Sequence, residues 1–201
     1  MKVSATLQQL VDDKLEASGL RKHLKAHGME AVDSARMADM GFAPRGGIFI
    51  PYFDFDGEVT QFFRVRFLED PPPNGWNATP IKPQRYAQPA GSVNEIYLSP
   101  LVPWNELKDD VSVPLVITEG EFKAACACSH DIAAIGLGGA WNFRAAKMCL
   151  PFLTQLERIK WRGRQVYVCF DSDAAEKPNV MAAEASLASE LLRRGADARI
   201  V

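Results

Sequence analysis

Long apolar runs are missing from this chain: among its 201 residues, no stretch approaches the roughly 20 consecutive apolar residues that cross a bilayer. An excess of one charge is missing as well, because 23 basic and 25 acidic side chains leave a formal net charge of −2. This balance is not typical of proteins that coat nucleic acid or membrane surfaces. We therefore expect no membrane partner, and any contact with nucleic acid must come from a local basic patch.

Cysteine and histidine are scarce. The four cysteines include no second close pair and no neighbouring histidine that would complete a zinc set. They are expected to be buried, reduced thiols in a cytoplasmic protein: Cys126, Cys128, Cys149 and Cys169. The histidines show no pairing of a base with a nucleophile, and surface or structural positions are expected for His23, His27 and His130.

The sequence pattern divides the chain into three regions. Residues 1–44 have helical spacing, with short helices expected at 4–19, 20–26 and 32–40. Residues 45–110 are expected to form a β-hairpin accessory region with a proline-rich loop at 69–93.

Residues 111–201 alternate strands and helices, which predicts an α/β domain with a parallel sheet and helices on both faces. A helical region is expected after residue 139, through Leu156. The last strand, Ala198–Val201, is cut short, so this domain is expected to be incomplete at the C-terminus.

Alternating side chains mark the second strand of the hairpin, which spans Val59–Phe67. Phe63, Val65 and Phe67 are predicted on one face, and Phe62, Arg64 and Arg66 on the other. Arginines beside an aromatic residue can hold a phosphate backbone or a nucleotide, although a solvated sheet face explains the same pattern. The candidate binding residues are Arg64, Arg66, Lys82 and Arg85.

Carboxylates follow two apolar strands of the α/β domain. Glu119 ends the strand that begins near Val113, and Asp171 and Asp173 follow the strand Gln165–Phe170. Open α/β sheets bind ligands at the carboxyl ends of their strands, and clustered carboxylates suit Mg²⁺ or Mn²⁺. The alternatives are a helix N-terminal carboxylate for Glu119 and capping or turn residues for the aspartates.

Glycines follow the intervening strand at Gly136, Gly138 and Gly139. They are typical of a turn that cradles phosphate, but a tight turn between a strand and a helix gives the same pattern.

Three segments together resemble the Toprim domain of primases, topoisomerases and related nucleases: Thr118–Ala124, Gly136–Gly139 and Phe170–Asp173. The closer resemblance is to the Toprim-like domain of unassigned function in phage, plasmid and mobile-element replication proteins. In those proteins a hairpin with an IPY-like strand, an RxR strand and a short tyrosine-containing segment precede the core. The corresponding residues here are Ile50-Pro51-Tyr52, Arg64-Val65-Arg66, Arg85-Tyr86 and Ile96-Tyr97-Leu98, and the resemblance covers roughly residues 41–201.

The resemblance implies a Toprim-like fold and metal-dependent nucleotidyl transfer in replication priming. Glu119 would be the general acid/base or a metal-linked residue, and Asp171 and Asp173 would bind Mg²⁺. Lys123 would contact nucleotide, with Gly120 and the glycine loop beside the site. Nucleoside triphosphates, a single-stranded DNA template and a replicative helicase are the implied partners. A Toprim nuclease and a non-catalytic module that binds nucleic acid or recruits a helicase remain as alternatives.

Overall fold

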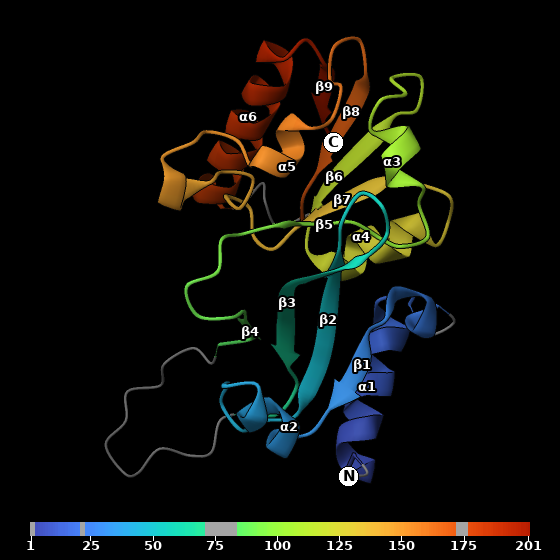
Figure 1. Ribbon diagram of the computed structural model, residues 1–201, viewed down its shortest axis with the longest axis vertical. Coiled ribbons are helices and arrows are strands. Elements are labelled where there is room, and N and C mark those ends of the chain that lie inside the picture. The colour runs from blue at the N-terminus through green and yellow to red at the C-terminus, as the bar shows by residue number, and fades with distance from the viewer. Residues whose placement is uncertain (1–2, 21–22, 71–83, 172–176) are drawn as a thin grey trace. The chain divides into compact units, whose positions relative to one another are not determined.

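The computed structural model describes residues 3–20, 23–70, 84–171 and 177–201, and the chain forms two compact units (Figure 1). The first unit contains Met1–Pro51 and Gln61–Ser92, and the second contains Tyr52–Thr60 and Val93–Val201. The tip of the hairpin thus groups with the second unit. In the described parts of the chain, no helix combines the length and apolar character needed to cross a membrane.

An antiparallel sheet organises the first unit. Its strands lie in the order β1-β2-β3-β4, where β1 is Glu30–Val32, β2 Gly47–Phe53, β3 Val59–Phe67 and β4 Tyr86–Ala87. The helices of this unit are α1 (Ala5–Ala17), the short 3₁₀ turn η1 (Leu24–His27) and α2 (Ser34–Asp39).

The expected helix at 4–19 is present as α1. The Ser4 hydroxyl accepts a hydrogen bond from the Leu7 N–H at 3.2 Å, which caps the first turn. The buried side of α1 presents Leu7, Val11 and Leu15 at helical spacing.

The expected helices at 20–26 and 32–40 are wrong in part. The first is only the 3₁₀ turn η1, which ends at Gly28 with φ +65°. Residues 30–32 instead form β1 and pair with β2, so α2 starts at Ser34, after the Asp33 carboxylate caps the Arg36 N–H at 2.9 Å. Pairing with a strand distant in sequence has overridden the local helical pattern.

The alternation predicted for β3 is confirmed on its apolar face. Val65 and Phe67 are buried with Val32 and Met37, and Phe63 packs against the same cluster. This face holds β3 against α2 and β1 and leaves its arginines on the other face.

A five-stranded sheet organises the second unit. Its order is β5-β7-β6-β8-β9, with β5 at Ile96–Tyr97, β6 at Leu115–Glu119, β7 at Ala134–Leu137, β8 at Gln165–Cys169 and β9 at Asp197–Ile200. The strands β7, β6, β8 and β9 are parallel, as the sequence predicts. The sheet is not wholly parallel, however, because β5 runs antiparallel to β7 at its edge.

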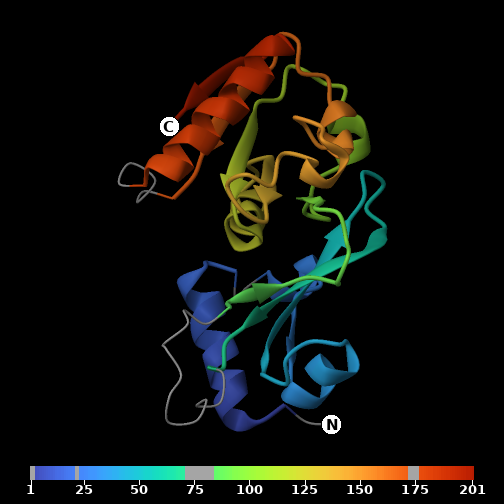
Figure 2. The same cartoon turned by 90° about the vertical axis from the view of Figure 1, so that its left-hand side faces the viewer.

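Helices connect the parallel strands. Helix α4 (Glu121–Cys128) links β6 to β7 and packs on both, and α6 (Pro178–Arg193) packs on β8 and β9 (Figure 2). After β6 the chain continues into β7, towards one edge of the sheet, and after β8 it continues into β9, towards the opposite edge. Because such crossovers are right-handed, α4 and α6 cover opposite faces. The reversal between β6 and β8 is a topological switch point.

The helical region expected through Leu156 is wrong. Residues after β7 form turns, the 3₁₀ turn η2 (Ala146–Met148) and only one short helix, α5 (Thr154–Glu157), while α3 (Trp104–Leu107) precedes β6. Cys149 adopts φ +55° and ends η2, and Leu150 bridges back to Ala145. A local reversal of the chain therefore replaces helical propagation.

Arg164 ties together the segments at the amino end of this sheet. Its buried guanidinium donates to the carbonyl oxygens of Leu107 and Lys108 at 2.9 and 3.1 Å, and to those of Lys160 and Val113 at 2.9 and 3.4 Å. Burial lowers the pKa of Arg164.

Candidate functional site at the carboxyl end of the sheet

Two of the expected site residues lie at neighbouring strand ends. Strands β6 and β8 are parallel neighbours, with Thr118 opposite Cys169. Glu119 is the last residue of β6, and Asp171 follows β8 by two residues. The two carboxylates therefore belong to the same edge of the sheet, on either side of the switch point where open α/β sheets bind ligands.

Lys123 contributes a cation to this edge. It lies in the first turn of α4, and its Nζ forms an ion pair with Oδ1 of Asp171. The side chains of Lys123 and Asp171 are 44% and 50% exposed, so solvent screens the pair. Exposed pairs stabilise a fold by about 0–1 kcal/mol, and this one can therefore open to admit a ligand at small cost.

Gly120 makes the turn from β6 into α4. It has φ +100° and ψ 143°, a conformation that side chains other than glycine rarely adopt. Its N–H donates to the Leu137 carbonyl oxygen at 2.7 Å. This turn holds the partly exposed Glu119 beside the end of β7.

The glycine loop, residues Gly136–Gly139, divides into two parts. Gly136 lies within β7, and a Cβ there would come within 3.1 Å of the Cβ atoms of both Ala124 and Tyr97. Its lack of a side chain therefore serves the packing of α4 and β5 on β7. Gly138 and Gly139 follow the strand, are partly exposed and lie at the same carboxyl edge as Glu119.

Glu121 is a buried carboxylate that the sequence patterns did not single out. It is 1% exposed, and its Oε1 accepts a hydrogen bond from the Tyr52 hydroxyl at 2.7 Å. The Tyr52 ring meets the Tyr97 ring edge to face, with centroids 5.6 Å apart. Burial raises the pKa of Tyr97 well above its usual value, and the nearby Cys128 and Glu121 raise it further.

One signal in the sequence could have identified this burial. Glu121 shares a helical face with Ala124, Ala125 and Cys128, all of them buried. A carboxylate at the start of an apolar helical stripe is expected to face the core and to need a donor there.

The donor groups at the carboxyl edge have the chemistry that suits a hydrated magnesium ion. Mg²⁺ commonly takes one or two carboxylates and completes its shell with water and substrate phosphates. Glu119 and Asp171 supply two such carboxylates, and the Lys123 ammonium already places a positive charge against Asp171. Among the described residues no group of three or more histidine, cysteine, aspartate or glutamate side chains is arranged to hold a metal. Asp173 lies outside those residues.

The expected binding residues of the first unit cluster around β4. The guanidinium carbons of Arg64 and Arg66 each lie 4.8 Å from the centroid of the Tyr86 ring, and Arg66 also donates to the Tyr86 hydroxyl. Arg64 is only 9% exposed, so this face is not simply solvated. Arg85 is exposed beside Tyr86, and Lys82 lies outside the described residues.

Comparison with known families covers only part of the second unit. Residues 103–201 match the model of a family described as a domain of unknown function (DUF3854). The matched segment begins just before α3 and includes β6, α4, β7, β8, α6 and β9. No curated protein and no solved structure matches the chain.

Proposed function

We propose that the second unit is a Toprim-like domain that carries out metal-dependent nucleotidyl transfer in DNA replication priming. Its substrates are nucleoside triphosphates and a single-stranded DNA template. The observation that carries the proposal is the position of Glu119 and Asp171 at the ends of adjacent parallel strands, across the switch point. Ligands of open α/β sheets bind in this crevice.

Glu119 and Asp171 would hold the cation, whose chemistry there is to neutralise charge on the triphosphate and to lower the pKa of the attacking 3′-hydroxyl. Glu119 is the partly exposed carboxylate that can accept the proton of that hydroxyl. Lys123 can exchange its ion pair with Asp171 for a triphosphate oxygen, because both partners are half exposed. Gly120, Gly138 and Gly139 carry no side chain that would keep a phosphate away from this edge.

One observation favours a second function, that of a domain which binds nucleic acid or recruits a helicase without catalysis. The Lys123 ammonium is paired with Asp171, so part of the acidic charge at this edge is balanced within the chain itself. A domain that binds nucleic acid or recruits a helicase without catalysis needs no further cation there. A Toprim nuclease would use the same carboxylates to cleave a phosphodiester.

A labelled-nucleotide assay on single-stranded template with Mg²⁺ separates these functions. Short oligomers support the proposed primase activity, shortened template indicates a nuclease, and neither product indicates the non-catalytic module. Glu119→Gln and Asp171→Asn should each reduce synthesis by about 100-fold or more, since general acid/base and charge contributions are of that size.

The matched control is Asp197→Asn. Asp197 begins β9 opposite Gln165, the first residue of β8, and so lies at the amino edge of the same sheet. Its carboxylate pairs with Arg199. We expect this variant to retain synthesis. An equal loss in Asp197→Asn would count against a site at the carboxyl edge.

Metal binding can be measured independently of turnover. Electron paramagnetic resonance of added Mn²⁺ should show bound ion with the unaltered chain and weaker binding with Asp171→Asn. Equal binding by both proteins would remove Asp171 from the proposed metal ligands.

A further inference from the structure

Arg45 of the first unit is a buried cation without a carboxylate partner among the described residues. The residue is 7% exposed. Its guanidinium carbon lies 3.9 Å from the centroid of the Phe67 ring, and its Nη2 donates to the Gln84 carbonyl oxygen at 3.1 Å. The buried Nε finds no acceptor in the part of the chain that the structure describes. The guanidinium is thus held rigidly and still has a donor to give.

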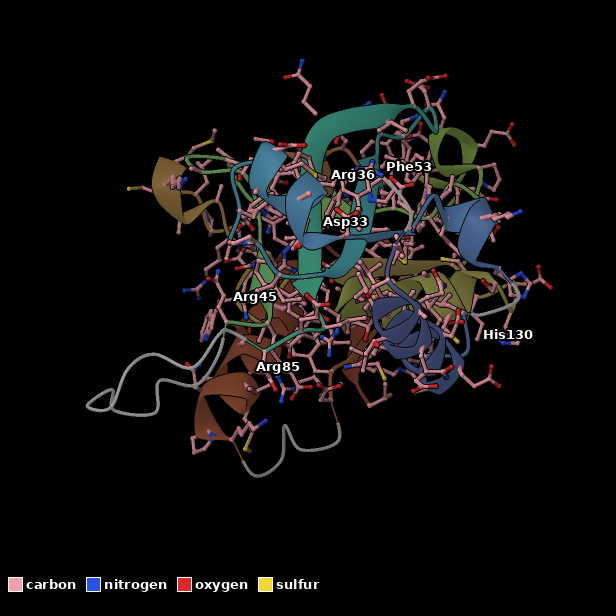
Figure 3. The ribbon with its side chains drawn as sticks, turned by 90° about the horizontal axis from the view of Figure 1, so that it is seen from below. Asp33, Arg36, Arg45, Phe53, Arg85 and His130 are labelled. Carbon is pink, nitrogen blue, oxygen red and sulfur yellow. The ribbon has the colours of Figure 1, made fainter. Side chains whose placement is uncertain are left out.

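A second arginine is fixed beside Arg45. Gln84 precedes Arg85, and the Arg85 carbonyl oxygen accepts a hydrogen bond from the Phe67 N–H at 2.9 Å. The same phenylalanine therefore lies under the guanidinium of Arg45 and holds the backbone of Arg85. Figure 3 shows Arg45 and Arg85 on the same side of this unit, apart from Arg36 and Asp33.

Counter-charge near these two arginines is limited. The Glu69 carboxylate lies beside Gly46, the residue after Arg45, and its Oε2 accepts the Gly46 N–H at 2.6 Å. No described carboxylate forms an ion pair with Arg45 or Arg85. The segment 71–83, which joins Asp70 to Gln84, contains Lys82 and no acidic residue in its sequence.

Burial of a charge without a partner is costly, so proteins keep a buried cation where an anionic side chain or ligand balances it. Guanidinium groups are matched in geometry to phosphate oxygens, which they bind through paired N–H donors. Arg64 and Arg66, which stack on Tyr86, lie on the other face of β3 and are not part of this pair. The chemistry of Arg45 and Arg85 is that of a phosphate site.

We propose that Arg45 and Arg85 form a site for the backbone phosphates of a nucleic-acid strand, with Arg45 as the rigid anchor and Arg85 as the exposed contact. The site deepens the proposed function by placing strand binding in the first unit, and it rests on that function only for the identity of the polymer. It requires neither Glu119 nor Asp171. Because phosphates carry no base identity, binding at this site is independent of sequence.

The test is a fluorescence-anisotropy titration of the full chain with a labelled oligodeoxythymidine, in EDTA so that no divalent metal contributes. Arg45→Gln and Arg85→Gln should each weaken binding by about fivefold or more. Each should also reduce the slope of log K against log salt by about 0.7, the value expected on a single strand when the protein neutralises one phosphate fewer.

Arg36→Gln is the matched control. Arg36 belongs to the same unit but pairs with Glu30, and its guanidinium lies 6.0 Å from the Phe49 centroid. It should bind like the unaltered chain. Unchanged affinity in both Arg45→Gln and Arg85→Gln, or an equal loss in Arg36→Gln, would overturn the proposal. Since Arg85 is exposed, its variant keeps the test valid if Arg45→Gln fails to fold.

Two further arms separate this inference from the proposed function. Asp171→Asn should bind the oligonucleotide as the unaltered chain does, and weaker binding there would move the strand to the second unit. ATP should compete only weakly, and competition as strong as that of unlabelled oligonucleotide would overturn the assignment to a strand. If the chain makes no primers but these arms behave as expected, the phosphate site stands and the proposed catalysis does not.

Discussion

The Tyr52 hydroxyl donates a hydrogen bond to the Glu121 carboxylate at 2.7 Å, and both side chains are buried in the second unit. The two residues are 69 positions apart in sequence. Tyr52 comes from the hairpin tip, and Glu121 opens the helix that follows Gly120. Through this bond, Tyr52 helps to fix the start of α4, where Lys123 also lies.

Tyr52→Phe should therefore lower the free energy of unfolding by about 1.5–3 kcal/mol, because it leaves a buried carboxylate without this donor. The measurement is urea denaturation at pH 7. As a control, Tyr167→Phe on β8 alters a partly exposed tyrosine and should have little effect. Equal stability of Tyr52→Phe and the unaltered chain would mean that other donors satisfy Glu121.

Asp171→Asn should leave the melting temperature nearly unchanged in the absence of metal. The Lys123–Asp171 ion pair is half exposed, so its removal costs about 0–1 kcal/mol at most. Thermal unfolding measured by circular dichroism checks this. A large drop in melting temperature would mark Asp171 as a structural residue.

Gly120→Ala should destabilise the fold by about 1–3 kcal/mol, because an alanine at φ +100° is strained wherever its Cβ points. Gly139→Ala is the control at the same edge. Its φ is not in the left-handed region, and its Cβ would meet only the Asn142 side chain, at 3.4 Å or more. We expect near-normal stability for Gly139→Ala by urea denaturation, and similar losses in both variants would contradict this account of Gly120.

His27 should make stability fall in mild acid. Burial lowers the pKa of His27 to about 4 from its usual 6.5, and the neighbouring His23 contributes to the same shift. Between these two values the unfolded chain binds a proton that the folded chain does not. The contribution of His27 is thus fully present above pH 6.5 and declines as the pH falls towards 4, by about 3 kcal/mol.

The check is urea denaturation at several pH values between 4 and 7, with His27→Gln and His130→Gln compared. The His27 variant should lose this part of the pH dependence. His130 is exposed, so its replacement should leave the dependence in place.

The sequence predicts well what depends on local alternation and on strand ends. The faces of β3 and the parallel order of β6 and β8 follow from apolar periodicity, and so does the shared edge of Glu119 and Asp171. The function of the site stays a proposal, because the matched family has no assigned function and a fold alone does not establish an activity.

What the sequence did not predict depends on partners far along the chain. Residues 30–32 became a strand because β2 is available to pair with them, and β5 runs antiparallel because of where it meets β7. Arg45 carries no periodic signal, since its burial arises from the Phe67 ring and the Gln84 carbonyl oxygen. The pattern of a single sequence does not show which distant segments will pair or pack together.

The hydrogen bonds of Arg164 have a consequence for how the second unit opens. One guanidinium joins the segments around Leu107, Val113 and Lys160, so these segments cannot separate without breaking several bonds to a buried charge. Amide protons at the amino end of β6 and β8 should then exchange with solvent only in global unfolding. Those around Gly120 and Asp171, joined by a screened ion pair, should exchange through local opening. The two ends of one sheet would thus differ in exchange rate, with the faster end at the strand termini that carry Glu119 and Asp171.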